Sequence, residues 1–319
     1  MHLTNLSKQS LSDSIKQKSK ELGFYDCGIS AAVFLEEDAQ RVEKWLSEGH
    51  HGNMKYLENN REKRYNPALL LENTRSVITV LLNYFPEKEL PTENNYILSK
   101  YAYGKDYHYI IKDKLNQLHL FLEEKTGKRS ARAFVDSAPL LDRAWARKSG
   151  LGFIGKNTCL INKKAGSFFF IGHLLVDLEL AYESESDPKN YCGKCTRCID
   201  ACPTQAIQPF NVDAQKCLSY LTIEYRGTLD ESVKKDFGNT LYGCDICQDV
   251  CPWNRFSQPH QEPDFNPSDK LKIMKKEDWE QLDKPLFNQL FKHSAVQRAG
   301  YKGLRRNIDF LANSANFEV

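Results

Sequence analysis

The stretch Cys192-Gly-Lys-Cys195-Thr-Arg-Cys198-Ile-Asp-Ala-Cys202-Pro203 decides how the second half of this chain folds. Its spacing, C-x2-C-x2-C-x3-C-P, is that of a bacterial ferredoxin run, in which three thiolates bind one [4Fe–4S] cluster and the fourth binds another. A second run, Cys244-x2-Cys247-x3-Cys251-Pro252, lacks its own first cysteine, and Cys217 upstream can supply the missing ligand. The spacing therefore predicts two clusters, which transfer electrons one at a time.

The geometry of a cubane cluster divides these cysteines into two sites. A tight C-x2-C-x2-C loop supplies three converging thiolates, and the proline after the fourth cysteine turns the backbone toward the other cluster. The predicted ligands are Cys192, Cys195, Cys198 and Cys251 for the first cluster, and Cys202, Cys217, Cys244 and Cys247 for the second. Structural zinc is the alternative, but zinc sites usually consist of paired C-x2-C knuckles. The remaining cysteines, Cys27 and Cys159, are predicted to be small buried hydrophobes.

Length and charge limit the other possibilities. The 319 residues suggest about two domains, and the residues before 181 suffice for a core of their own. A formal net charge of +2 provides no global basic field, so any RNA contact needs a local patch. No apolar run reaches the roughly 18 residues that span a bilayer. Residues 1–20 are polar and lack the apolar stretch of a signal peptide, so we expect a reduced, cytoplasmic protein without membrane contact.

The first part of the chain alternates helices and strands. The apolar periodicity predicts helices over residues 10–22, 31–46, 107–125 and 139–148. Short β-branched or apolar runs predict strands over residues 24–30, 76–84, 131–135 and 167–178. The run Gly150-Leu-Gly152-Phe-Ile-Gly155 imitates a dinucleotide-binding motif. It follows a predicted helix instead of a strand, so we predict a loop there.

Several polar segments are candidates for the site that the clusters serve. They are Glu62–Pro67, Tyr103–His108, Val135–Arg143 and Gly155–Thr158. With L-Y-G-C-D-x-C-Q-x-V-C-P at Leu241–Pro252, these motifs cover nearly the whole chain. The chain resembles the epoxyqueuosine reductases, which are cobalamin and iron–sulfur enzymes that complete queuosine in the tRNA anticodon.

The resemblance implies a fold and an activity. The expected fold is α+β: a flavin-fold-like (nitroreductase-like) cobalamin-binding domain over 1–180, a ferredoxin-like two-cluster domain over 181–260 and a short helical C-terminal segment over 261–319. The expected activity is reduction of epoxyqueuosine to queuosine at the wobble position of tRNA. Two [4Fe–4S] clusters would supply electrons to low-valent cobalamin, and Asp136 would donate a proton. Two other classes stay open: a reductive dehalogenase-like reductase of a small molecule, and an electron-carrier ferredoxin subunit.

The resemblance also implies residue roles. The positions expected to approach the corrin are Arg64, Ser99, Asp136, Asn157, Leu160, Ile171 and Asp245. Some family members have cysteine where Ser99 stands, so that side chain is not a required metal ligand. From the sequence alone, Asp136 is equally well explained as a helix N-cap. Asp106-Tyr-His108 resembles the start of the D-x-H-x-x-G cobalamin motif, but position 111 is Ile, so we expect a base-off cofactor without a histidine on cobalt.

The expected partners are tRNA carrying epoxyqueuosine and an unidentified electron donor, with the chain acting as a monomer. Two basic sets are candidates for phosphate contact. One is Arg143, Arg147 and Lys148 near Asp136, and the other is Lys302, Arg305 and Arg306 near the C-terminus. The simpler alternative is that both sets are ordinary solvated surface.

Overall fold

A four-stranded antiparallel sheet forms the centre of the first lobe, in the order β1-β2-β7-β4. The computed structural model describes residues 7–127, 130–184 and 191–312. The strands are β1 (Asp26–Ala31), β2 (Ser76–Asn83), β4 (Ala131–Phe134) and β7 (Phe169–Val176). The central strands β2 and β7 pair along their full length, from Ser76↔Val176 to Asn83↔Phe169. Both are apolar runs buried almost throughout, because helices cover both faces of the sheet.

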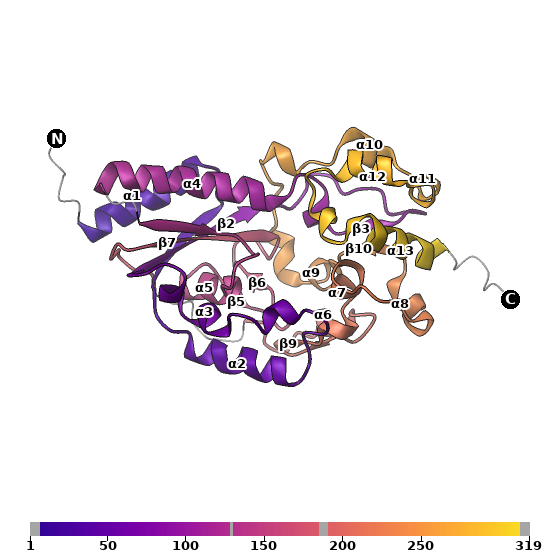
Figure 1. The fold of residues 1–319 in the computed structure, drawn as a ribbon, viewed down its shortest axis with the longest axis horizontal. Coiled ribbons are helices and arrows are strands. Elements are labelled where there is room, and N and C mark those ends of the chain that lie inside the picture. Colours follow the sequence, from indigo (N-terminus) through magenta and orange to yellow (C-terminus); the bar gives the residue numbers. More distant parts are fainter. Residues whose placement is uncertain (1–6, 128–129, 185–190, 313–319) are drawn as a thin grey trace.

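Helices α1 (Lys8–Glu21) and α4 (Tyr107–Thr126) cover one face of this sheet, and α5 (Asp142–Lys148) covers the other (Figure 1). Helix α4 buries a stripe at helical spacing that includes Ile111, Leu115 and Leu122. It ends at Gly127, which has a left-handed φ of 69°. Helices α2 (Glu36–Ser47) and α3 (Arg61–Tyr65) lie on the α5 side in Figure 1.

The second lobe consists of short elements. Its helices are α6 (Arg197–Asp200), α7 (Leu218–Ile223), α8 (Lys234–Phe237), α9 (Ile246–Asp249), α10 (Asp269–Ile273), α11 (Lys276–Glu280), α12 (Lys284–Phe291) and α13 (Gly300–Ala312). The short strands of the chain are β3 (Ile97–Leu98), β5 (Phe153–Ile154), β6 (Leu160–Ile161), β8 (Ile207–Gln208), β9 (Asn211–Val212) and β10 (Thr240–Tyr242). The 3-10 turns are η1 (Lys55–Leu57), η2 (Pro67–Leu69), η3 (Lys100–Ala102), η4 (Ala214–Lys216), η5 (Glu231–Val233), η6 (Pro252–Phe256), η7 (Pro263–Phe265) and η8 (Ala295–Arg298).

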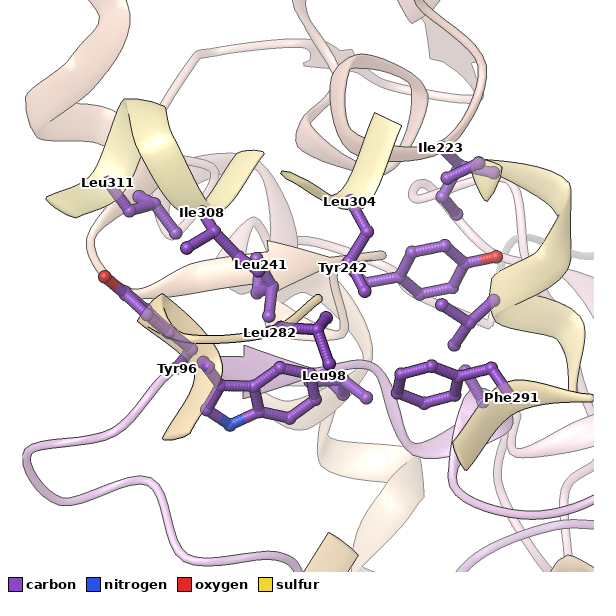
Figure 2. Close-up of a cluster of buried hydrophobic side chains, with 14 of the residues drawn as sticks. Tyr96, Leu98, Ile223, Leu241, Tyr242, Leu282, Phe291, Leu304, Ile308 and Leu311 are labelled. Carbon is purple, nitrogen blue, oxygen red and sulfur yellow. The ribbon is translucent and has the colours of Figure 1, made fainter. Parts of the chain in front are cut away.

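The C-terminal helices are part of the core of the second lobe, which corrects the expectation of a short helical tail. Leu304 and Ile308 of α13 are fully buried and share one apolar cluster with Leu241 and Tyr242 of β10 (Figure 2). The same cluster contains Leu98 of β3, which pairs in parallel with β10. Residues from the first hundred positions therefore help to form the core of the second lobe.

The predicted elements of the first lobe are all present, and two helices begin later than expected. The helix predicted from residue 31 begins at Glu36, because β1 continues to Ala31. The helix predicted from residue 139 begins at Asp142, because residues 135–141 form a loop that carries Asp136. Residues 150–155 form a loop followed by the two-residue strand β5. Among the described residues, no helix has both the length and the apolar character needed to cross a membrane.

Candidate active site

The motif cysteines gather into two groups. Burial first, and then the nearby sulfurs of Cys192, Cys251 and Cys195, raise the pKa of Cys198 to about 11. Burial, and then the sulfurs of Cys217 and Cys202, raise the pKa of Cys244 to about 12.

Cys247 has Cys159, Cys244 and Cys217 among its neighbours. In the described part of the chain, no three His, Cys, Asp or Glu side chains converge as one metal ion would require. A [4Fe–4S] cluster does not require this convergence, because each thiolate binds a different iron.

Asp136 lies on the loop between β4 and α5. Helix α5 begins at Asp142, and its N-cap residue, Leu141, makes no side-chain cap hydrogen bond. The N-cap explanation of Asp136 is therefore wrong. Asp136 has a φ of 47°, in the left-handed region, where a residue other than glycine costs about 1–3 kcal/mol and often serves a functional site. Its side chain is 63% exposed, so a ligand can reach the carboxyl group.

The first turn of α4 holds the carboxylate of Asp136. Tyr107 Oη donates a hydrogen bond of 2.8 Å to Asp136 Oδ2, and His108 Nε2 lies 3.6 Å from the same oxygen. The Tyr107 ring stacks on the rings of Phe170 and His108, with centroid distances of 4.1 Å and 4.3 Å. Asp106 caps α4 by accepting from the His108 backbone N–H, and its Oδ1 also lies 2.7 Å from His108 Nδ1. Both nitrogens of the His108 ring therefore face carboxylates.

The environment of Asp136 favours its protonated form. The pKa of Asp136 is raised first by desolvation from the surrounding protein and then by the negative charge of Asp142. The Tyr107 hydrogen bond and the charge of His108 act in the opposite direction. Burial also acts against the charge of His108, but the hydrogen bond and charge of Asp106 outweigh it and raise the pKa of His108. An exposed carboxyl group with a raised pKa has the properties of a general acid.

Ser99, Asn157 and Asp245 lie together beside the second cysteine group. Ser99 Oγ donates a hydrogen bond of 2.7 Å to Asp245 Oδ1, and the Lys100 backbone N–H donates one of 2.7 Å to Oδ2. Asn157 Nδ2 donates a hydrogen bond of 3.3 Å to the carbonyl of Cys247. The cysteine loop that contains Asp245 is thereby attached to the first lobe.

Leu160 and Ile171 belong to a small apolar cluster, whereas Arg64 lies near Asp142. Leu160 of β6 is buried, and Ile171 of β7 packs against its cluster. Arg64 Nη2 donates to the carbonyl of Tyr56 at 2.9 Å, but its buried Nε has no hydrogen-bond partner. Burial lowers the pKa of Arg64, and the nearby charge of Asp142 acts in the opposite direction. The unpaired Nε–H can therefore donate to a ligand.

The loop Gly155–Cys159 contains, besides Asn157, two residues with no individual role expected from the sequence, Lys156 and Thr158. Lys156 is buried, and its Nζ donates to the carbonyls of Gly193 and Cys195 at 2.8 Å each. Thr158 has a φ of 63°, an unusual conformation for a β-branched residue, and its carbonyl accepts a 2.6 Å hydrogen bond from Arg143 Nη1. The loop thus connects both cysteine groups to α5. In the sequence, the pair Lys156-Asn157 marks this loop. The sequence does not reveal the contacts of Lys156, because Gly193 and Cys195 lie almost forty residues further along the chain.

The two unassigned cysteines differ. Cys27 is buried in the sheet core, and burial raises its pKa to about 12, in agreement with the prediction. Cys159 instead forms a thiol hydrogen bond with Cys247, which lowers the pKa of Cys159. The expectation that Cys159 is only a small hydrophobe is therefore corrected, because its sulfur faces the second cysteine group.

The arginines expected to contact RNA have internal partners. Arg147 Nη2 pairs with Asp38 Oδ2 at 2.9 Å, with both side chains only 16% exposed. Arg305 pairs with Asp309 and donates to the carbonyl of Glu280 at 2.6 Å. Arg306 donates to the carbonyls of Leu221, Tyr225 and Gly227 and to the side chain of Asn307. These bonds occupy the guanidinium of Arg306, so the expectation that it contacts phosphate is corrected.

The other expected RNA contacts are more accessible. Arg143 and Lys302 are exposed, and Lys148 is half-buried.

Comparisons with known proteins agree with this geometry. Residues 64–137 match the family described as "Epoxyqueuosine reductase QueG, DUF1730", and residues 191–254 match the "4Fe-4S double cluster binding domain". The chain is 53% identical over 306 residues to the epoxyqueuosine reductase of Cellulophaga algicola, covering 96% of this chain and 99% of the relative. It is 38% identical to the epoxyqueuosine reductase of Escherichia coli K12, covering 98% of this chain and 83% of that one.

Solved structures show the same relationship. An epoxyqueuosine reductase crystallised with an epoxyqueuosine-modified tRNA-Tyr stem loop aligns with a TM-score of 0.87 at 30% identity, covering 94% of this chain and 80% of that one. A reductive dehalogenase described as B12-dependent aligns with a TM-score of 0.51 at 15% identity, covering 96% of this chain and 38% of that one, which shows a shared fold alone. On these grounds, the chain belongs to the epoxyqueuosine reductase family.

Proposed function

We propose that this chain reduces epoxyqueuosine to queuosine in the anticodon of tRNA, with a cobalamin and two [4Fe–4S] clusters as cofactors. The observation that carries the proposal is the setting of Asp136. Its carboxyl group is exposed, its pKa is raised, and it is held by Tyr107 in a fold shared with reductases of this substrate. The reductive dehalogenase alternative has support from the fold alone.

The residues of the candidate site fit a cobalamin. The buried Nε of Arg64 has no protein partner and can donate to a polar group of the cofactor. Leu160 and Ile171 supply apolar surface, and Ser99 with Asp245 supplies a polar edge near the second cysteine group. His108 has a carboxylate at each ring nitrogen, which is consistent with a base-off cofactor without this histidine on cobalt. We infer that the first lobe is the flavin-fold-like cobalamin-binding domain.

The chemistry requires a proton source at Asp136. Opening an epoxide and releasing its oxygen as water, with formation of a carbon–carbon double bond, consumes two electrons and two protons. Bound cobalamin would supply a low-valent metal that delivers the electrons. Asp136, whose pKa is raised by desolvation and by Asp142, would donate a proton to the oxygen as it develops negative charge. Tyr107 would hold the carboxyl group in place through its hydrogen bond.

The tRNA contact and the electron route complete the proposal. Arg143 is exposed on α5 beside the Asp136 loop, and Lys302 is exposed on α13, so we propose these side chains with Lys148 as phosphate contacts. We further propose that the eight motif cysteines hold the two clusters in the predicted pairing. We propose a cytoplasmic location, since the proposed substrate is tRNA, and a monomer as the active form.

The variant Asp136→Asn tests the proposal, because it preserves shape but cannot donate a carboxyl proton. Reconstituted protein, cobalamin and titanium(III) citrate are incubated with epoxyqueuosine-containing tRNA, and queuosine is measured by mass spectrometry of the nucleosides. We expect turnover to fall by about 10²–10⁴-fold, with cobalamin and tRNA binding unchanged. Asp113→Asn on the exposed face of α4 is the matched control. Wild-type protein that makes no queuosine, or an Asn variant as active as the parent, would contradict the proposal.

A further inference from the structure

The loops of the first cysteine group meet the surface among unpaired cations. Lys194 and Arg197 lie within the loop that carries Cys192, Cys195 and Cys198, and both side chains are exposed. Lys163 and Arg255 are exposed on neighbouring segments, with Arg255 four residues after Cys251. None of these four cations forms an ion pair with any carboxylate in the described part of the chain, although Asp200 lies nearby and accepts a hydrogen bond from Thr196.

A strip of aromatic rings runs between two of these cations. The contacts, by centroid distance, are Lys163 Nζ over Tyr191 at 3.6 Å, Tyr191 to Phe153 at 5.1 Å, Phe153 to Trp253 at 5.5 Å, Trp253 to Phe256 at 6.3 Å and the Arg255 guanidinium over Phe256 at 4.5 Å. Tyr191 directly precedes Cys192, and Trp253 follows Cys251 by two residues. We call this surface the cluster face: Lys163, Tyr191, Lys194, Arg197, Trp253, Arg255 and Phe256.

The loop of the second cysteine group is bound by residues expected at the candidate active site. Asp245, between Cys244 and Cys247, is bound by Ser99, and the carbonyl of Cys247 is bound by Asn157. The first group is therefore the one with an exposed approach, and the second is the one attached to the site residues. Electrons that arrive from another protein would enter at the first group and leave from the second.

We propose that the cluster face binds an acidic one-electron carrier protein, of the flavodoxin or ferredoxin class, which reduces the first cluster. In each encounter the carrier loses one electron and the first cluster gains one, with no bond made or broken. Two encounters supply the two electrons that reduction of one epoxyqueuosine consumes. This use of the electrons rests on the proposed function. Unpaired cations steer an acidic partner toward the surface, and a small face with few apolar rings suits a complex that must dissociate after each transfer.

The position of the face favours a carrier over RNA as its occupant. A carrier must bring its redox centre close to a cluster, and Lys194 and Arg197 lie in the same loop as three cysteines of the first group, with Arg255 four residues after the fourth. The tRNA must instead bring its modified base to Asp136, whose neighbours are Tyr107, His108 and Asp142. The proposed carrier surface and the Asp136 site therefore consist of different residues.

The test measures reduction of the first cluster directly, without tRNA. Reconstituted protein is mixed with a reduced, acidic bacterial flavodoxin, and the loss of iron–sulfur absorbance is followed by stopped flow. In the variant Lys163→Gln, Lys194→Gln, Arg197→Gln and Arg255→Gln, we expect the second-order rate constant at low salt to fall by about tenfold or more, with a flatter salt dependence. Reduction by titanium(III) citrate, iron content and the thermal melting temperature should equal those of the wild type.

A matched control also removes four exposed cations, at positions outside the cluster face, and should leave the flavodoxin rate unchanged: Lys20→Gln on α1, Lys112→Gln on α4, Lys235→Gln on α8 and Lys270→Gln on α10. An equal rate constant for the cluster-face variant and the wild type would overturn the proposal. Loss of tRNA affinity in the same variant, with carrier kinetics unchanged, would also overturn it and assign the face to RNA. Because cluster reduction is read without substrate turnover, failure of the proposed function would leave this readout intact.

Discussion

At the scale of single residues, the acidity of Asp136 depends on its neighbours more than on its own chemistry. The surrounding protein disfavours its charged form, and the carboxylate of Asp142 adds to that effect. Asp142 is itself held at the start of α5, where its Oδ1 lies 3.1 Å from Nε2 of the buried His173. The charge that raises the pKa of Asp136 is therefore kept in place by a side chain from β7.

Removing that charge predicts a shift in the pH profile. A general acid works in its protonated form, so activity is present below the pKa of Asp136 and is lost as the pH rises through it. Asp142→Asn removes a negative charge that raises this pKa, so the alkaline limb of kcat/KM should move to lower pH. The amide preserves the shape and can still contact His173. The measurement is queuosine formation across pH at subsaturating tRNA.

The control for this pH experiment is Asp113→Asn, which changes an exposed carboxylate on the outer face of α4. Its profile should coincide with that of the wild type. If the alkaline limb of kcat/KM stays in place in Asp142→Asn, or moves to higher pH, then this limb does not reflect the titration of Asp136.

Another single residue with an unusual setting is Lys156. Its ammonium group is buried, and its hydrogen bonds go to two backbone carbonyls of the first cysteine loop. No carboxylate of the described chain forms an ion pair with it, and a buried cation is costly without an opposite charge nearby. A [4Fe–4S] cluster with four thiolates is an anion, so a cluster bound at this loop would provide that charge.

At the scale of elements, helix α13 connects the end of the chain to the cluster domain. Arg306 binds three carbonyls near the end of α7 and after it, and Asn307 Nδ2 donates to the carbonyls of Thr222 and Leu241 at 2.9 Å and 3.0 Å. Leu304 and Ile308 fill the core beneath them. The helix is therefore held by polar and apolar contacts together.

The variant Arg306→Ala should destabilise the protein, because it leaves partly buried carbonyl groups without their donor. We expect a loss of roughly 1–3 kcal/mol in the free energy of unfolding, measured by urea denaturation. Lys302→Ala, at an exposed position of the same helix, should change it by less than about 0.5 kcal/mol. An Arg306 variant that keeps its full stability while losing tRNA affinity would restore the phosphate contact predicted from the sequence.

At the scale of the whole molecule, the two lobes meet where the clusters would lie. Segment Gly155–Cys159 of the first lobe contacts both cysteine groups, and Ser99 binds the loop of the second group. Strand β10, just before Cys244, pairs with β3 from the first hundred residues. Cluster binding and lobe association are therefore coupled, because the same loops serve both.

The pairing of the cysteines predicts the iron content of two variants. Anaerobically reconstituted protein should contain about eight iron and eight sulfide per chain. Cys198→Ala should lose one cluster and Cys217→Ala the other, each leaving about four iron. Iron analysis and electron paramagnetic resonance of the reduced proteins check this, since the signals that remain should differ between the variants. Stoichiometric zinc, or the same residual signal in both, would refute the pairing.

Local sequence determined much of this protein. The cysteine runs predict two cluster sites, because two- and three-residue steps constrain where successive thiols can point, and Cys198 and Cys244 each lie near other motif cysteines. The apolar runs at β2 and β7 and the helical stripe of α4 predict the central sheet and its cover, because burial follows periodicity. The motif around Asp136 identifies the candidate acid by its resemblance to a family.

Tertiary structure alone decided which polar groups are free to act. Arg306 and Arg305 have similar local surroundings in the sequence, yet carbonyls from residues some eighty positions away occupy Arg306. Lys156 approaches the first cysteine loop, and Asp136 is a loop residue with a left-handed backbone instead of a helix cap. The physical reason is the same in each case: periodicity and spacing act over a few residues, whereas desolvation and hydrogen-bond partners come from whatever the folded chain packs nearby.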